Sequence, residues 1–432
     1  MGLKRDAGLV RTIGTRSLAA STICIVVGAG IFAVPGALAA SMGPYAPIAI
    51  LICAIAMGSI GICFAEAGSR IATSGGAYGF IHTAFGPLVG YIAGMLMCVG
   101  NLLATGSVAA ALADVATSLL PLALKAAVHA FVIVAVIGGI AYVNIGGVGR
   151  AARLVGWATI LKLAPLVIFI IFGAAAVHAG NYVSTEALSG EGFGRAFILA
   201  LFAFTGMETG LCASGEVVNP GRTIPRALAL GLGTITLLYI SIQVVAQGIL
   251  GSALAQSTVP LADAMAQISP ALRVLMLAGA AVSMLGYLTA DLMGTPRVLF
   301  AFARDGLLPG ALGRLQARSK APHIAIICYA LIAMGLAVTG TFAELAVLAT
   351  LTSAALYVLI CAAAWRLARR GVAEAGRPLQ FKWLPTAAVV GIGSMLGAIA
   401  LASQEEILGL LALIAVCVVV YWLQTRVAVP QA

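Results

Sequence analysis

Long apolar segments separated by short polar connections run through almost the whole chain. Apolar stretches of about 18 residues or more recur between Ser17 and Arg426. At about 1.5 Å per helical residue, each is long enough to cross the roughly 30 Å hydrocarbon core of a membrane. Segments such as Leu163 to Val177 are apolar on every face, whereas the strands of a membrane barrel alternate apolar and polar positions. The pattern therefore predicts transmembrane helices. We expect them over residues 17–40, 44–66, 86–119, 127–147, 152–178, 193–215, 226–251, 271–303, 322–341, 343–366, 383–402 and 407–425.

The composition supports a chain that is surrounded by lipid. Hydrophobic residues make up 62% of the 432 positions and charged residues only 9%, and the mean hydropathy is +1.10. Soluble domains carry about 25% charged residues. The first residues are charged but include no short cleavable apolar region, so we expect the first span to be retained rather than removed as a signal peptide.

The net charge of +10 lies in the predicted connections. With the N-terminus inside, only Lys125, Arg195 and Arg273 of the 24 basic residues fall in outer loops, and Lys162 falls within a span, which leaves 20 on the inner side. This asymmetry follows the positive-inside rule and predicts that both termini are cytoplasmic. We interpret the basic residues as topology signals, so nucleic acid is not an expected partner. The compact chain favours a plasma membrane, of the bacterial inner membrane type.

Glycines interrupt the first and sixth predicted spans at corresponding places, with Gly28 and Gly30 in one and Gly206 in the other. Backbone groups that lose their helical partners within a membrane are tolerated only where they line a cavity or contact a ligand. Five spans separate the two interruptions, so the second unit is inverted relative to the first, as in transporters built from inverted repeats. The predicted repeats cover residues 1–178, which hold the N-terminal tail and helices 1–5, and 193–366, which hold helices 6–10. Residues 383–432 then add helices 11 and 12.

Four motifs in register resemble those of the amino acid, polyamine and organocation (APC) superfamily. They are Val27 to Gly36, Thr73 to Tyr78, Phe202 to Glu208 with Glu216 to Ala227, and Arg297 with Ala303 to Pro309. The match runs in order from residue 17 to about residue 370. The resemblance implies an all-α membrane protein with 12 transmembrane helices and a leucine-transporter-type 5+5 inverted repeat. In that fold helices 1 and 6 are broken, and the protein transports a solute by alternating access.

The resemblance also implies how a substrate is held. In the family the amides of broken helix 1 bind the substrate carboxylate, which here indicates Gly28, Ala29 and Gly30. A half-helix N-terminus suits this role because its N–H groups are unpaired and it carries about half a positive charge. Carbonyls freed at Val26, Phe202, Ala203 and Thr205 would accept hydrogen bonds from the substrate ammonium. The aromatic side chains of Phe202 and Phe204 would line the wall of the site. Family members often have serine where this chain has Ala29, so one hydroxyl contact to the carboxylate is missing.

Three ionisable residues lie within predicted spans, namely Lys162, Glu208 and Asp291. Such residues are costly in a membrane and usually functional, although mutual neutralisation that only holds helices together is the alternative. Some sodium-independent family members are similar in placing a lysine where others bind sodium, which implies that Lys162 replaces that ion. Glu208 resembles the family's proton-sensing acid. Asp291 stands where the family usually has a small polar residue, and either a pair with Lys162 or a position facing the substrate would explain it.

Together these features predict a secondary transporter of small to medium neutral amino acids, proton-coupled or exchanging and independent of sodium. The alternative is an exchanger of polyamines, organic cations or cationic amino acids, which Asp291 favours. An enzyme or a channel would not require two broken helices in inverted repeats. Eight scattered cysteines and four scattered histidines give no metal-ligand spacing, so neither a metal nor another cofactor is expected. The sequence leaves open whether the protein is a homodimer.

Overall fold

The structure is a computed structural model. It describes residues 13–28, 30–71, 76–118, 120–146, 162–183, 190–210, 217–304, 306–317, 319, 321–374 and 378–427. Regular secondary structure in these ranges is helical, apart from one isolated bridge between Ile13 and Val217. The α-helices are α1 (Thr15–Val26), α2 (Gly30–Met42), α3 (Ala46–Arg70), α4 (Ala77–Phe85), α5 (Pro87–Thr117), α6 (Leu122–Ile145), α8 (Leu163–Ala174), α9 (Gly190–Phe204), α10 (Met207–Gly210), α11 (Pro220–Leu250), α12 (Pro260–Ala266), α13 (Pro270–Arg304), α14 (His323–Thr339), α15 (Phe342–Arg369), α16 (Leu384–Ala400) and α17 (Gln404–Val427). Short 3₁₀ turns are η1 (Gly43–Tyr45), η2 (Ala179–Tyr182), η4 (Gly251–Gln256) and η5 (Gly310–Gly313).

The all-helical membrane architecture expected from the sequence is confirmed at the level of its elements. Each predicted span contains a described helix, although the span at 152–178 is described only from Lys162 onward. Among the described residues, seven helical segments are long and apolar enough to cross a membrane, and α8, α14 and α16 are shorter apolar helices. The sequence did not predict α4 and α12, which are too short to give a span-length apolar signal.

Local chemistry accounts for several helix boundaries. Pro87 and Pro220 stand at the first position of α5 and α11, where a missing N–H costs nothing and the fixed φ suits a helix. The residue before Pro220 is Asn219, the one non-glycine residue with positive φ (46°) in the described part of the chain. At α15 a capping box forms, because the Thr341 hydroxyl accepts from the Glu344 N–H and the Glu344 carboxylate accepts from the Thr341 N–H.

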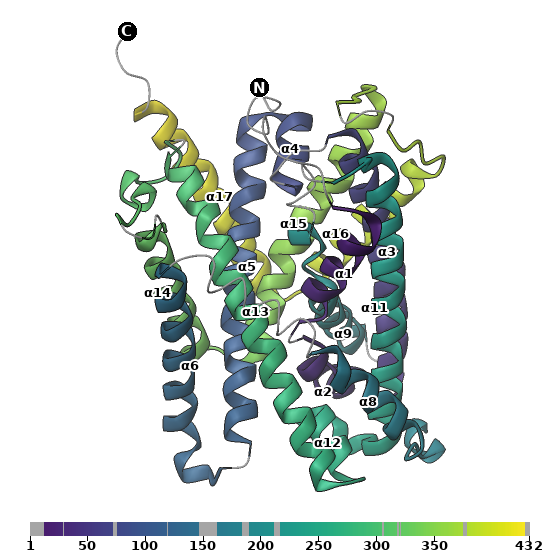
Figure 1. The fold of residues 1–432 in the computed structure, drawn as a ribbon. Coiled ribbons are helices and arrows are strands. Elements are labelled where there is room, and N and C mark those ends of the chain that lie inside the picture. The colour runs from purple at the N-terminus through teal and green to yellow at the C-terminus, as the bar shows by residue number, and fades with distance from the viewer. Residues whose placement is uncertain are drawn as a thin grey trace.

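Figure 1 shows long helices that run roughly along one direction, with short segments between them. The pair α6 and α14 packs at one flank, and α3 packs on α11 at the other. The short segments α1, α2 and α9 lie between these flanks, where α1 packs on α11 and α2 packs on α9 (Figure 1). This arrangement brings the ends of the interrupted helices into the interior of the bundle.

Candidate functional site

The interruption predicted in the first span is confirmed. Helix α1 ends at Val26 and α2 begins at Gly30. Val27 has φ −71° and ψ 73°, and the Gly28 N–H donates to the Val26 carbonyl at 2.7 Å, which is the geometry of an inverse γ-turn. Ala29 lies outside the described residues. The first N–H groups of α2 have no earlier helical turn to pair with, so they face the interruption as donors.

The interruption in the sixth span is also confirmed. Helix α9 ends at Phe204 and α10 begins at Met207. Gly206 has φ +110°, a conformation that residues with a Cβ rarely adopt. The Thr205 hydroxyl donates to the Phe202 carbonyl at 2.8 Å, so this freed carbonyl is satisfied by the chain itself.

The two interruptions meet at the hydroxyl of Tyr239 on α11. Its oxygen lies 3.0 Å from the Val26 carbonyl oxygen and 3.0 Å from the Ala203 carbonyl oxygen. The backbones also approach closely, because a Cβ added to Gly30 would lie 3.1 Å from the Ala203 Cα. Residues predicted from both spans therefore share one site, and Tyr239 links them.

A second hydroxyl contacts the first interruption from α13. The Ser283 Oγ donates to the Gly28 carbonyl at 3.1 Å, and Ser283 is fully buried. Sequence reasoning missed both Tyr239 and Ser283. Their only signal is a polar atom within an apolar span, and such hydroxyls commonly bond within their own helix instead.

Aromatic side chains surround the interruption of the sixth span. Phe202 packs edge-on against Phe342 at a ring-centroid distance of 5.7 Å, and Phe204 packs against Tyr239 at 5.1 Å. Phe204 is fully buried and Phe202 nearly so. These contacts fix the ring of Tyr239 and the orientation of the α9 end on which the two phenylalanines stand.

Glu208 lies directly after the second interruption and is buried, with 3% of its surface exposed. Its Oε2 accepts a hydrogen bond from the Tyr357 hydroxyl at 2.6 Å and one from the Gly206 N–H at 3.1 Å. Tyr357 belongs to α15 and is itself buried. The carboxylate thus connects α10 to α15 and supports the turn at Gly206.

Asp291 lies on α13 and contacts three hydroxyl groups. Oδ2 accepts from Thr105 at 2.6 Å and from Tyr329 at 2.5 Å, and Oδ1 accepts from Thr295 at 2.6 Å. Asn101 extends the cluster by donating to Thr295 at 3.0 Å. Of the two explanations that the sequence left open, a pair with Lys162 is not found among the described contacts of Asp291.

Lys162 is buried, with 5% of its surface exposed, and it precedes α8. Three residues later Pro165 packs against Gly279 of α13, where an added Cβ would lie 2.6 Å from the proline Cγ. Helix α8 thus packs on α13, the helix that carries Ser283.

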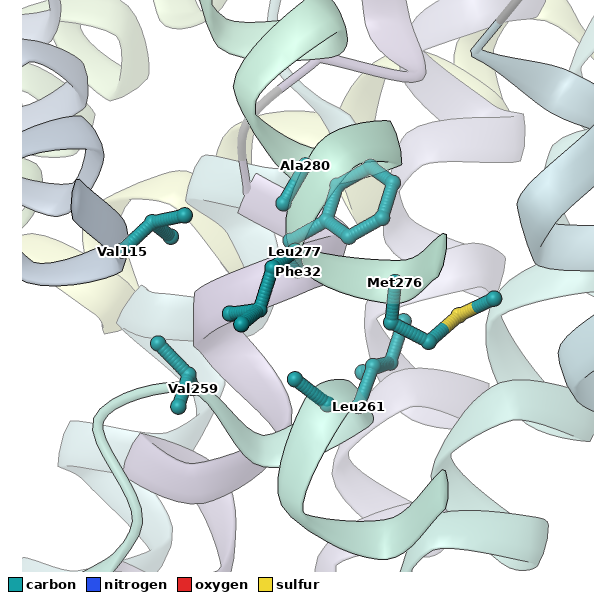
Figure 2. Close-up of a pocket in the computed structure, with 8 residues that line it drawn as sticks. Phe32, Val115, Val259, Leu261, Met276, Leu277 and Ala280 are labelled. Atoms are coloured by element: carbon teal, nitrogen blue, oxygen red, sulfur yellow. The ribbon is translucent and has the colours of Figure 1, made fainter. Parts of the chain in front are cut away.

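A small apolar cavity borders the first turn of α2. Figure 2 shows its lining side chains, which carry carbon and sulfur but no oxygen or nitrogen. They are Phe32, Val115, Val259, Leu261, Ala262, Met276, Leu277 and Ala280. Its volume of about 10 Å³ corresponds to roughly one water-sized sphere. Apolar packing therefore closes the bundle on this side of the interruptions.

Comparisons with known proteins agree with this architecture. A family model described as amino acid permease matches residues 13–424. The chain is 27% identical to the branched-chain amino acid permease BcaP of Bacillus subtilis (strain 168), over 83% of this chain and 81% of that protein. It is 27% identical to the methylthioribose transporter of the same organism, over 81% and 80% of the two chains. It is 30% identical to an uncharacterised transporter of Mycobacterium tuberculosis (strain CDC 1551 / Oshkosh), over 71% and 69%. The chain belongs to the amino acid permease family.

Proposed function

We propose that this permease is a secondary active transporter of small to medium neutral amino acids in the plasma membrane. It works by alternating access around the two helix interruptions. In this proposal twelve helices span the membrane, residues 1–178 and 193–366 form the inverted repeats, and residues 383–432 are an appended helix pair. The observation that supports the proposal most directly is the meeting of both interruptions at Tyr239.

The site offers both the hydrogen-bond donors and the hydrogen-bond acceptors that an amino acid headgroup needs. The N–H groups at the start of α2, together with those of Ala29 and Gly28, would bind the carboxylate, and the Gly28 N–H would leave the Val26 carbonyl to do so. The Val26 and Ala203 carbonyls would accept from the ammonium. A tyrosine hydroxyl has one proton and each carbonyl oxygen has two lone pairs, so Tyr239 leaves acceptor capacity on Ala203, whereas Val26 also accepts from the Gly28 N–H. Binding energy then comes from charge-assisted hydrogen bonds, which are the stronger kind.

The side-chain environment favours neutral substrates. Phe202, Phe204 and Phe342 supply apolar surface beside the interruptions. The printed names of two relatives, a permease of branched-chain amino acids and a methylthioribose transporter, refer to solutes without an extra positive charge. A small or medium apolar side chain suits such walls.

Asp291 is the observation that favours the second candidate, an exchanger of cationic amino acids, polyamines or other organic cations. A partly buried carboxylate in a membrane span would attract a cation. Its oxygens already accept from Thr105, Thr295 and Tyr329, which occupies three of about four acceptor positions. A cationic substrate would have to displace these hydroxyls or share the carboxylate with them, so we rank this candidate second.

For coupling we propose that Lys162 takes the place of a sodium ion and that Glu208 carries the proton. Lys162 is buried directly before α8, and α8 packs on α13, the helix whose Ser283 contacts the Gly28 carbonyl. Glu208 can respond to the site because its carboxylate accepts from Gly206, within the second interruption, and from Tyr357 of α15. Proton binding at Glu208 would change both contacts at once.

Uptake into proteoliposomes tests the proposed function. Leucine, alanine, arginine, putrescine and methylthioribose are compared as competitors of labelled leucine, with and without an imposed proton gradient and with sodium omitted. We expect leucine and alanine to compete, the gradient to stimulate uptake, and sodium to have no effect. Uptake of labelled arginine or putrescine without any uptake of labelled leucine would instead establish the second candidate.

A further inference from the structure

A groove far from the helix interruptions lies where α3 and α15 end and α16 begins. Its volume is about 570 Å³, within the range of roughly 300–1,000 Å³ that is usual for small-molecule sites. Polar, charged and aromatic side chains from three helices and their connections line it. They are Glu66, Arg70, Trp365, Ala368, Arg369, Gln380, Phe381, Lys382, Leu384 and Pro385.

The acidic member of this lining is already neutralised. The Glu66 Oε1 accepts from Nε and Nη2 of Arg70 at 3.0 and 2.7 Å, and its Oε2 accepts from the Phe381 N–H at 3.3 Å. The remaining donor of Arg70, Nη1, donates to the Val372 carbonyl at 3.0 Å. This buried pair fixes the connection between α15 and α16 against the end of α3, and it adds no net charge to the groove.

Two cations of the lining stay available to a ligand. Arg369 and Lys382 are both exposed, and neither makes a salt bridge with a carboxylate in the described part of the chain. The Arg369 guanidinium lies over the Trp365 ring, 4.9 Å from its centroid. This contact holds the guanidinium plane at the groove while its N–H groups remain free to donate. The groove therefore carries an excess of two positive charges.

Aromatic residues at its edge indicate that the groove faces the membrane interface. Trp383 follows Lys382 directly and is 68% exposed, and Phe381 is 38% exposed. Tryptophan is enriched at the level of lipid headgroups, because its ring is apolar and its N–H is polar. In the proposed orientation this is the cytoplasmic face, where anionic lipids attract basic residues next to a span.

From this arrangement we infer that the groove binds the phosphate headgroup of an anionic inner-leaflet lipid. Arg369 and Lys382 hold the phosphate oxygens, Gln380 contacts the polar part of the headgroup, and Trp383 and Phe381 lie beside the first carbons of the acyl chains. A soluble phosphate ester shares the phosphate chemistry but lacks the chains. The assignment does not depend on which solute the permease transports.

Titration calorimetry on the purified full-length protein tests the inference with three probes. They are dioctanoyl phosphatidylglycerol, dioctanoyl phosphatidylcholine and glycerol 1-phosphate. We expect the phosphatidylglycerol to bind tightest and its affinity to fall as ionic strength rises, because exposed charges are screened. The double variant Arg369→Gln, Lys382→Gln should weaken its binding roughly 30-fold, the combined effect of two cations near a membrane surface.

The matched control removes two exposed arginines outside the groove, Arg222→Gln with Arg314→Gln. It should bind phosphatidylglycerol like the unchanged protein. Equal weakening in both double variants, or no weakening in the groove variant, would overturn the inference. Glycerol 1-phosphate binding as tightly as the lipid would overturn the assignment to a lipid. The salt dependence is measured on the unchanged protein, so the test does not depend on the folding of a variant.

Discussion

At the scale of single residues, hydroxyl groups satisfy the carbonyls that the interruptions release. The Tyr239 hydroxyl contacts the carbonyls of Val26 and Ala203. The Ser283 hydroxyl donates to the Gly28 carbonyl, and the Thr205 hydroxyl donates to the Phe202 carbonyl. A neutral hydrogen bond contributes only about 0.5–1.5 kcal/mol net, whereas one to a charged group contributes about 1.5–3 kcal/mol. An arriving ammonium can therefore replace a hydroxyl at these carbonyls with a gain in free energy.

Replacement of Tyr239 by phenylalanine tests this exchange. Tyr239→Phe removes the donor to both carbonyls, and we expect it to lower the free energy of unfolding by about 1–2 kcal/mol. Saturating leucine should then stabilise the variant more than it stabilises the unchanged protein, because the ammonium meets an unpaired acceptor at Ala203 and only the Gly28 N–H at the Val26 carbonyl. Thermal unfolding of the purified protein with and without leucine measures the difference.

Tyr182→Phe is the matched control for this prediction. It also removes a hydroxyl that donates to a carbonyl of α11, that of Val244 at 2.7 Å, but away from both interruptions. It should lower stability without enlarging the leucine effect. If leucine stabilises Tyr239→Phe no more than Tyr182→Phe, the carbonyls at the interruptions do not receive the substrate.

Glu208→Gln separates proton coupling from transport itself. Glutamine keeps an oxygen that can accept from Tyr357 and Gly206 but cannot take up a proton. We expect leucine exchange between the two sides to continue, while an imposed proton gradient no longer stimulates net uptake. Proteoliposomes measure both rates. Glu344→Gln, in the exposed first turn of α15, is the control and should keep its gradient dependence.

Lys162→Met tests the other half of the coupling hypothesis. Methionine preserves the length and apolar stem of the side chain but not its charge. In the proposed coupling the Lys162 charge acts at the first interruption, so its loss should slow gradient-driven uptake roughly tenfold or more. Unchanged gradient-driven uptake in both Lys162→Met and Glu208→Gln would show that neither residue takes part in coupling.

At the scale of elements, the glycine pattern was sufficient to predict where two helices break, because a weakened helix backbone is a local property. The partners of the breaks were not predictable in this way. Thr105 and Asp291 are 186 positions apart in the sequence, yet their side chains bond at 2.6 Å. Tyr239 and Val26 are 213 positions apart. Only the packing of α5 on α13 and of α1 on α11 brings such residues together, and no periodicity along the chain records it.

Gly206→Ala tests whether the second interruption needs its left-handed turn. A Cβ at φ +110° is strained, and it would lie 3.1 Å from the Ile25 Cγ2. We expect a cost of about 1–3 kcal/mol in stability and a strong loss of leucine uptake at unchanged membrane insertion. The control is Gly233→Ala in α11, where nothing lies within 4 Å of the added atom. It should be neutral or stabilise the protein by up to about 1 kcal/mol. Equal uptake by the two variants would show that the turn at Gly206 is dispensable.

At the scale of the whole molecule, sequence and fold place function and orientation in different parts of the chain. The interruptions lie in the interior, where most side chains are apolar and the hydroxyls of Tyr239, Ser283 and Thr205 contact the released backbone. Most of the basic residues in the described ranges stand near helix ends or in connections, where the sequence predicts that they set the topology. This separation explains why composition predicted a membrane protein and the positions of the basic residues predicted an orientation, while the solute had to be inferred from a handful of buried polar atoms.

Introduced cysteines test the proposed orientation of the whole bundle. Thr258 and Glu374 are both exposed, the first in the connection before α12 and the second in the basic connection after α15. If the termini are cytoplasmic, a membrane-impermeant maleimide should label Thr258→Cys on intact cells and Glu374→Cys only after permeabilisation. The unchanged protein gives the background from its own cysteines. The reverse labelling pattern would place the basic connections outside, contrary to the positive-inside rule. It would also put the groove lined by Arg369 and Lys382 at the outer leaflet.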